Sequence, residues 1–258
     1  MIEIFEELDK FSNIKFQDEG HIYTINGEVA TSCTTLIGKY EKPFEEEYWS
    51  KRKADEEGIP QQEMLDRWKS MGDLASLKGT QVHNYLEYYL NNKIYQFSNI
   101  NEGVVPDKWE EEEKHFYQIV PMIEKFCSDI KGKMIPIKSE LVIGDEELMI
   151  TGMIDQVFYN KKSGLLELWD WKTNKKIDIK TRYKLLKPVN NLSTSKLDLY
   201  SLQLGMYKYL IEQNTNLKFG DSYICWFHEK NDTYKTFKCV DTSEEIKKIV
   251  KDYSSASK

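Results

Sequence analysis

The sequence ITGMIDQVFYNKKSGLLELWDWK, residues 150–172, contains two apolar stretches of β-favouring residues joined by a short polar turn. We expect these stretches to form neighbouring strands of one sheet. Because successive side chains of a strand point to opposite faces, Asp170 and Lys172 should emerge together on one face. Trp169 and Trp171 should pack on the other face. One edge of the sheet therefore presents an acid and an amine side by side.

A second acid lies fifteen residues earlier, where Asp155 interrupts the first stretch. The turn at residues 160–164 folds the two strands back on each other and brings Asp155 alongside Asp170. Clustered carboxylate oxygens are ligands suited to magnesium or manganese. The lysine beside them favours hydrolysis over storage of a metal ion.

These two strands belong to a longer β-region in the middle third of the chain. Residues 139–143 form another apolar stretch, and a turn at 144–147 separates it from residues 148–159. With 165–172 as the third strand, we expect an antiparallel meander. The remaining pattern predicts hairpins over 13–31 and 222–240, and helices over 32–37, 44–70 with a break at 58–60, 72–90, 106–130 with a kink or split at Pro121, 198–213 and 243–253.

The composition is that of a folded chain with a sizeable core. Of 258 residues, 40% are hydrophobic and 13% aromatic, which suits one elaborated domain and argues against disorder. No run approaches the roughly eighteen apolar residues of a membrane span, and the N-terminus is acidic where a secretory signal is basic. We therefore expect a soluble cytoplasmic protein. The cysteines lack a Cys-x-x-Cys spacing, which argues against a zinc ribbon or a disulfide framework; they are Cys33, Cys127, Cys225 and Cys239.

The charge is distributed unevenly along the chain. The net charge is −7, yet residues 161–208 contain eleven Lys or Arg against four acids and carry +7, so the remainder carries −14. A basic stretch that begins at the acid-rich strand and continues through a polar segment is the footprint that a phosphate backbone needs. A solvated, charged loop would show the same composition.

Two further pairs of residues have helical spacing. His83 and Glu87 are four residues apart, as are Gln203 and Tyr207, so each pair shares one face of a helix. Taken singly, each feature has a structural explanation: an Asp-x-Lys on a strand is commonly an edge salt bridge, and a helical His or Gln is commonly a packing residue. The order and spacing of the features across four elements favour a function.

That order is carried by His83, Asp155, Asp170-x-Lys172 and Gln203-x-x-x-Tyr207. It closely resembles the RecB-type branch of the PD-(D/E)XK nuclease superfamily, and looks most like its phage-type and mitochondrial genome maintenance exonucleases. The resemblance covers roughly residues 75–210. It implies an α/β, restriction endonuclease-like fold with a central mixed sheet flanked by helices. We expect a single nuclease domain over 1–258, with an N-terminal hairpin and helical elaboration over 1–71 and a catalytic core over 72–253.

The resemblance also implies roles for individual residues. One or two Mg²⁺ or Mn²⁺ ions would be held by Asp155, Asp170 and the backbone carbonyl of Trp171, with His83 as a further ligand. Lys172 would orient the attacking water or stabilise charge on the phosphorane. The other candidates are Glu140 as a catalytic residue and Glu87 as an outer-shell ligand, and, as substrate contacts, Gln203, Tyr207, Thr173, Lys175, Arg182 and Lys184.

The activity implied by the resemblance is that of a metal-dependent DNA exonuclease with 5′-phosphate products, acting on strand ends of single- or double-stranded DNA. A recombination or replication protein would be its partner. An endonuclease on the same scaffold and a catalytically decayed nucleic-acid binding module remain alternatives. A hydrolase of small phosphate esters would not need the long basic stretch. Some members of the superfamily bind an iron–sulfur cluster through one early and three late cysteines, but only Cys225 and Cys239 lie late here, so we expect no cluster.

Overall fold

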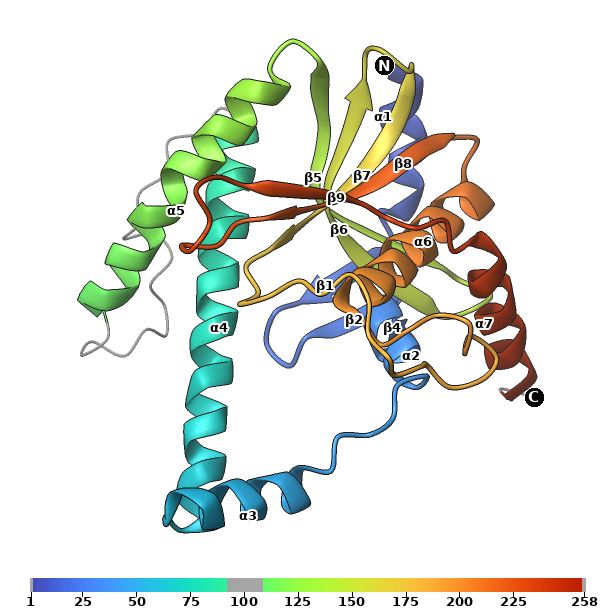
Figure 1. Ribbon diagram of the computed structural model, residues 1–258. Helices are drawn as coiled ribbons and strands as arrows, with labels where there is room; N and C mark the ends of the chain where they lie inside the picture. The colour runs from blue at the N-terminus through green and yellow to red at the C-terminus, as the bar shows by residue number, and fades with distance from the viewer. Residues whose placement is uncertain (1, 92–108, 257–258) are drawn as a thin grey trace.

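The computed structural model of the protein describes residues 2–91 and 109–256. Within these residues, six strands form a central mixed sheet (Figure 1). Its middle is the predicted antiparallel meander of β5 (Met134–Asp145), β6 (Ile150–Asn160) and β7 (Leu165–Lys172). The prediction of a mixed α/β fold is therefore confirmed.

The last two strands of the sheet come from the C-terminal hairpin. β8 (Phe219–Trp226) pairs with β7 in parallel, and β9 (Lys235–Lys238) pairs with β8 in the antiparallel direction at the sheet edge. The short β4 (Thr31–Ser32) pairs in parallel with the start of β6. The parallel pairing of β7 with β8 places the ends of both strands next to each other, with Lys172 opposite Trp226.

Helices cover both faces of the sheet (Figure 1). One face is covered by α6 (Lys196–Asn214), with α2 (Cys33–Gly38) and α7 (Ser243–Ala256) beside it. The other face is covered by α4 (Gln61–Leu90) and α5 (Trp109–Ile130). None of the helices within the described ranges is both long enough and apolar enough to cross a membrane.

Residues 165–172 alternate between the two faces of the sheet, as predicted, and each face is covered by its own hydrophobic core. Trp169 and Trp171 are buried beneath α4 and α5, in contact with Phe126 and Phe158. Leu168 belongs to the other core, which lies beneath α6. Since the tryptophans occupy one face, Asp170 and Lys172 are directed to the face that α6 covers.

The N-terminal region packs against the meander. Ser32 caps α2, because its Oγ accepts a hydrogen bond from the Thr35 N–H at 3.0 Å. The elements that precede the cap are α1 (Ile2–Leu8), a 3₁₀ turn (Asp9–Phe11) and a small antiparallel sheet of β1 (Ile14–Gln17), β2 (Ile22–Ile25) and β3 (Glu28–Val29).

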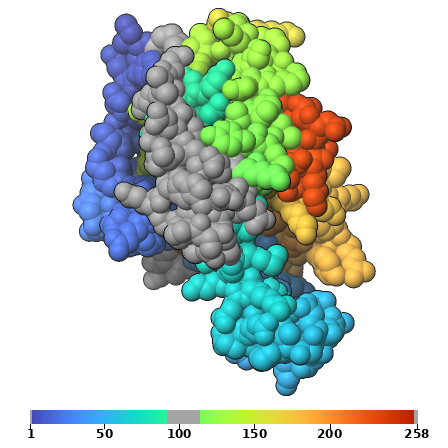
Figure 2. Space-filling view, turned by 90° about the vertical axis from the view of Figure 1, so that its left-hand side faces the viewer, coloured from blue at the N-terminus to red at the C-terminus, as the bar shows by residue number. Residues whose placement is uncertain are grey.

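A helical arm projects from the body of the protein (Figures 1 and 2). It consists of α3 (Glu46–Glu57) and the first half of α4, which pack on each other. The sequence predicts a helix boundary between residues 70 and 72, but α4 continues through Gly72. One glycine costs a helix only about 1 kcal/mol, which is too little to end it. Similarly, Pro121 lies inside α5 and does not end that helix.

Candidate metal centre

The candidate site lies where β6 and β7 separate. The ladder of paired residues between these strands ends at Gln156 and Trp169, and the next residues are Asp155 and Asp170. In place of a ladder bond, Asp155 Oδ2 accepts a hydrogen bond from the Trp171 backbone N–H at 2.7 Å. Both acids are buried. The fork between the strands thus holds two carboxyl groups side by side inside the protein.

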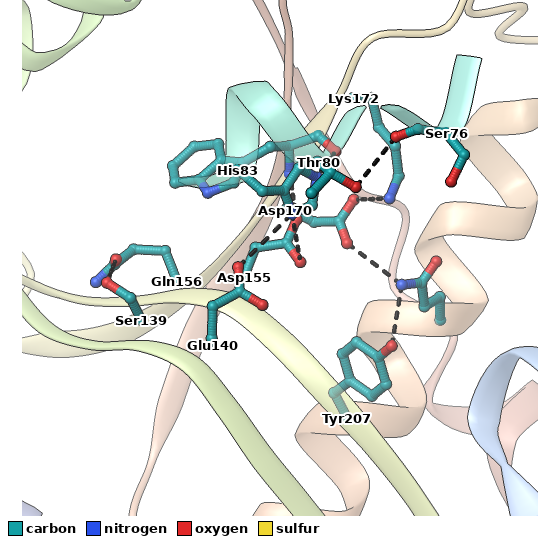
Figure 3. A network of polar contacts seen from close by, with 12 residues as sticks. Ser76, Thr80, His83, Ser139, Glu140, Asp155, Gln156, Asp170, Lys172 and Tyr207 are labelled. Atoms are coloured by element: carbon teal, nitrogen blue, oxygen red, sulfur yellow. Dashed lines mark hydrogen bonds and ion pairs between the residues drawn. The ribbon is translucent and has the colours of Figure 1, made fainter. Parts of the chain in front are cut away.

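Three side chains from three elements converge at this fork, as Figure 3 shows. His83 comes from α4, Glu140 from β5 and Asp155 from β6. The Nδ1 atom of His83 lies 3.6 Å from a Glu140 carboxylate oxygen and 3.7 Å from Asp155 Oδ1. Its Nε2 atom lies 3.3 Å from the backbone oxygen of Trp171. One ligand atom from each of the three side chains lies within 4.8 Å of the other two. An imidazole nitrogen and two carboxylates in this arrangement fit a divalent metal ion. The Trp171 oxygen lies at the other nitrogen of the His83 ring, so its predicted role as a ligand stays a prediction.

Glu140 reaches the cluster through an uncommon backbone conformation. Its φ is 47°, in the left-handed region that residues other than glycine seldom adopt, whereas its neighbours Ser139 and Leu141 keep their partners on β6. Such a conformation costs on the order of 1 to 3 kcal/mol and is typical of functional sites. The strain therefore supports the prediction that Glu140 belongs to the site.

A second group of contacts surrounds Asp170. Its Oδ2 forms an ion pair with Lys172 Nζ, and its Oδ1 accepts a hydrogen bond from Gln203 Nε2 at 3.3 Å. The same Gln203 nitrogen donates to the hydroxyl of Tyr207 at 3.0 Å. The Tyr207 ring in turn lies against Gly152 on β6. In this structure Gln203 and Tyr207 therefore hold a carboxylate in place, and their predicted contact with substrate stays a prediction.

Burial and charge set the protonation of the cluster. Burial raises the pKa of Asp155, against the opposing charges of His83 and Lys172. Burial and the neighbouring Asp155 raise the pKa of Asp170 to about 6, although Lys172 opposes the shift. For His83, burial disfavours the charged form, but Asp155 and Glu140 outweigh it and raise the pKa of the imidazole to about 9. For Lys172, Asp170 and Asp155 likewise outweigh burial and raise the pKa, so the ammonium stays charged.

The affinity of the site for a divalent ion is expected to rise with pH. A histidine must be neutral to bind a metal ion, whereas His83 is protonated below its pKa of about 9. If one proton competes with the ion, the dissociation constant should fall about tenfold per pH unit between about pH 6 and pH 9. Mn²⁺ titrations by calorimetry in two buffers of different ionisation enthalpy would measure both the affinity and the released proton. Affinity that does not change over this range would contradict the argument, and His83→Gln should flatten the profile.

Other predicted residues lie outside this cluster. Glu87 follows His83 by one turn of α4, and no contact joins its carboxylate to the cluster among the described side chains. Thr173 lies against α4, with Oγ1 3.7 Å from where a Cβ on Gly79 would be. The exposed Lys175 follows on the same loop.

The basic residues further along the loop are exposed. The guanidinium of Arg182 donates to the Tyr183 hydroxyl at 2.8 Å and lies over the ring of that residue. Lys184 Nζ donates to the backbone oxygen of Asn191 at 3.0 Å. The structure thus places these two cations on the surface of the loop after β7, where their contacts are with residues of that loop.

Tyr200 is a site residue that the sequence analysis missed. Lys172 Nζ lies 4.7 Å from the centre of its ring, and its hydroxyl donates to Asn174 Oδ1 at 2.6 Å. A signal was present, because Tyr200 precedes Gln203 by three residues and Tyr207 by seven, which is the spacing of one helical face. All three side chains therefore face the fork from α6.

The sequence and this geometry agree with one known family. The model of the PD-(D/E)XK nuclease superfamily matches residues 52–255. The chain belongs to this superfamily. The match reaches beyond the range 75–210 on which the sequence resemblance rests, and it includes much of the helical arm. No characterised relative among the curated proteins matches the chain.

One solved structure similar to this superfamily member is titled "Crystal structure of SSO0001". It shares 13% sequence identity, with 71% of this chain and 74% of that chain covered, at a TM-score of 0.29. PD-(D/E)XK nucleases use divalent metal ions, and the donor set of His83, Glu140 and Asp155 agrees with that use. The superfamily member described here is thus a nuclease by family, with a site that fits a divalent ion.

Proposed function

We propose that the protein is a Mg²⁺- or Mn²⁺-dependent DNA exonuclease of the RecB-type branch, which hydrolyses phosphodiester bonds and leaves 5′-phosphate products. The observation that carries the proposal is the position of the His83, Glu140 and Asp155 cluster directly beside the Asp170–Lys172 pair. A metal-binding donor set and a permanently charged ammonium at one fork are the groups that phosphodiester hydrolysis requires.

The residues of the proposed site have different roles in the reaction. A bound divalent ion supplies a nucleophile at neutral pH and offsets charge that develops on the phosphate. Asp155 and Asp170 supply the negative charge that attracts the ion, and the N–H of Trp171 fixes the orientation of Asp155. Lys172 places a compact positive charge beside Asp170, where it attracts the scissile phosphate and stabilises the charge added to it.

The preference for strand ends rests on the surroundings of the site. The basic loop 173–195 begins directly after Lys172 and returns to α6, which supports Asp170 through Gln203. On the opposite side, α4 carries His83 and continues into the helical arm (Figure 1). We propose that these two segments enclose the site so that a threaded strand end reaches it.

Digestion of matched linear and circular DNA, single- and double-stranded, with Mg²⁺ or Mn²⁺ tests the proposal, with Lys172→Ala as the control. Degradation of linear DNA alone, lost in the variant, would support an exonuclease and would define its strand preference. Cutting of closed circles would replace it with an endonuclease on the same scaffold. Failure of the wild-type protein to cut any of these substrates would reject the nuclease activity.

The basic loop should contribute to binding without reading sequence. The logarithm of the DNA association constant falls as the logarithm of the salt concentration rises, and each lost phosphate contact makes this slope shallower by about 0.7 to 0.9. We expect a reduced slope and weaker binding to all sequences when four loop cations are replaced by Ala, namely Lys180, Arg182, Lys184 and Lys187. Fluorescence anisotropy at several salt concentrations measures this. A control removes the same charge elsewhere, at Lys218, Lys247, Lys248 and Lys251; equal slopes in the two variants would argue against the loop.

A further inference from the structure

The ammonium of Lys172 lies between a negatively charged group and an uncharged aromatic ring. On one side is the Asp170 carboxylate, and on the other is the ring of Tyr200, 4.7 Å from Nζ to the ring centre. A lysine side chain has four rotatable carbon segments, and fixing it costs up to about 2 kcal/mol of conformational entropy. The two contacts together offset this cost and hold the charge in one place.

Tyr200 is itself held rigidly. Its hydroxyl donates to Asn174 Oδ1 at 2.6 Å, and the backbone oxygen of Asn174 accepts a hydrogen bond from Trp226 Nε1 at 2.7 Å. Burial raises the pKa of the Tyr200 phenol, so the hydroxyl remains a donor at neutral pH. The ring is thus a fixed, uncharged surface, anchored to the loop after β7 and to the end of β8.

The two contacts of Lys172 respond differently to a metal ion. The oxygen of Asp170 that pairs with the ammonium is also the kind of oxygen that a divalent ion attracts, so the ion and the ammonium compete for it. The π-face of the Tyr200 ring attracts the ammonium but offers none of the oxygen ligands that a hard divalent ion prefers. The contact with the ring therefore persists when Asp170 is engaged elsewhere.

We propose that Tyr200 is a positioning residue for Lys172, which keeps the ammonium at the scissile phosphate when Asp170 turns to the metal ion. This inference rests on the proposed nuclease function and deepens it. It assigns one helix, α6, the support of both catalytic groups: Gln203 fixes Asp170, and Tyr200 fixes Lys172. The ring, rather than the hydroxyl, makes the contact that matters for catalysis.

Substitutions at residue 200 separate the ring from the hydroxyl. Tyr200→Leu removes the π-face, and we expect kcat on DNA to fall about 10- to 100-fold with KM changed less than about threefold, as for a displaced catalytic group. Tyr200→Phe keeps the face and should retain kcat within about threefold. Tyr209→Leu, on the same helix but without a contact to Lys172, controls for loss of a tyrosine from α6. Equal losses in the Leu and Phe variants would overturn the proposal.

A double-variant cycle tests whether the effect passes through Lys172. In the Lys172→Ala background, the residual rate of cleavage, followed under single-turnover conditions over long incubations, should change little on adding Tyr200→Leu, because the group that it positions is absent. The same four proteins, unfolded in urea without DNA or metal, should show non-additive midpoints. The urea measurement distinguishes failure of the proposed nuclease function from failure of the positioning role. If the wild-type protein cuts no DNA, the proposed function falls while the coupling in urea is still measured. If DNA is cut but both cycles are additive, the positioning role is wrong and the nuclease function stands.

Discussion

Replacement of Asp170 by Asn is expected to lower the rate of DNA cleavage on the order of 10³-fold or more, because the charge that attracts the metal ion is removed from a water-poor site. Asp170 is 1% exposed, and Asn has the same shape. Gln203 can still donate to the remaining carbonyl oxygen, so the position of the side chain should be kept. DNA binding should be retained, since Lys172 and the basic loop are unchanged.

Three measurements check this expectation. Single-turnover cleavage gives the chemical step, anisotropy gives DNA affinity, and the rise in melting temperature on adding Mn²⁺ reports metal binding, which should shrink in the variant. Asp221→Asn is a matched control, because Asp221 pairs with Lys238 on the exposed edge of the sheet. Retention of most of the activity by Asp170→Asn would show that the fork is not the catalytic centre.

The part of the site that can be predicted from the sequence is the part governed by local geometry. Alternation along residues 165–172 is enough to place Asp170 and Lys172 opposite the two tryptophans, because a strand repeats every two residues. The short turn after β6 is enough to bring Asp155 to the same fork. Helical spacing likewise places Gln203 and Tyr207 on one face of α6.

Other features depend on contacts between distant segments or on backbone energies, which a local pattern does not contain. The parallel pairing of β7 with β8 brings Trp226 next to Lys172, although 54 residues separate them in the sequence. The φ of 47° at Glu140 is set by the tertiary structure around β5. Helical spacing could have placed Tyr200 on the face of α6 that carries Gln203 and Tyr207, but its contact with Lys172 also depends on the loop 173–195 between β7 and α6, which has no regular period.

Gly152→Ala should destabilise the protein and impair catalysis, although Gly152 has no side chain that could act at the site. A Cβ at this position would lie 2.2 Å from Cε1 of Tyr207, a distance at which one group must move. Tyr207 is buried, so its ring has little room, and overpacking of this kind costs about 1 to 3 kcal/mol. Movement of the ring would also withdraw the hydroxyl that holds Gln203, and with it the support of Asp170. We expect kcat/KM to fall about 100-fold, as for a catalytic group displaced by about 1 Å.

Gly72→Ala is the matched control for this substitution. A Cβ at Gly72 meets no atom within 4 Å, and alanine favours the helix by about 0.5 to 1 kcal/mol, so this variant should be as stable as the wild type or more stable. The role of the ring is tested by Tyr207→Leu. In that background the added methyl group of Gly152→Ala meets no aromatic ring, and most of its cost in urea denaturation should disappear. An equal cost in both backgrounds would mean that Gly152 acts through β6 itself. A large reduction would establish that the glycine is required because α6 must approach β6 closely enough for Tyr207 and Gln203 to hold Asp170 in place.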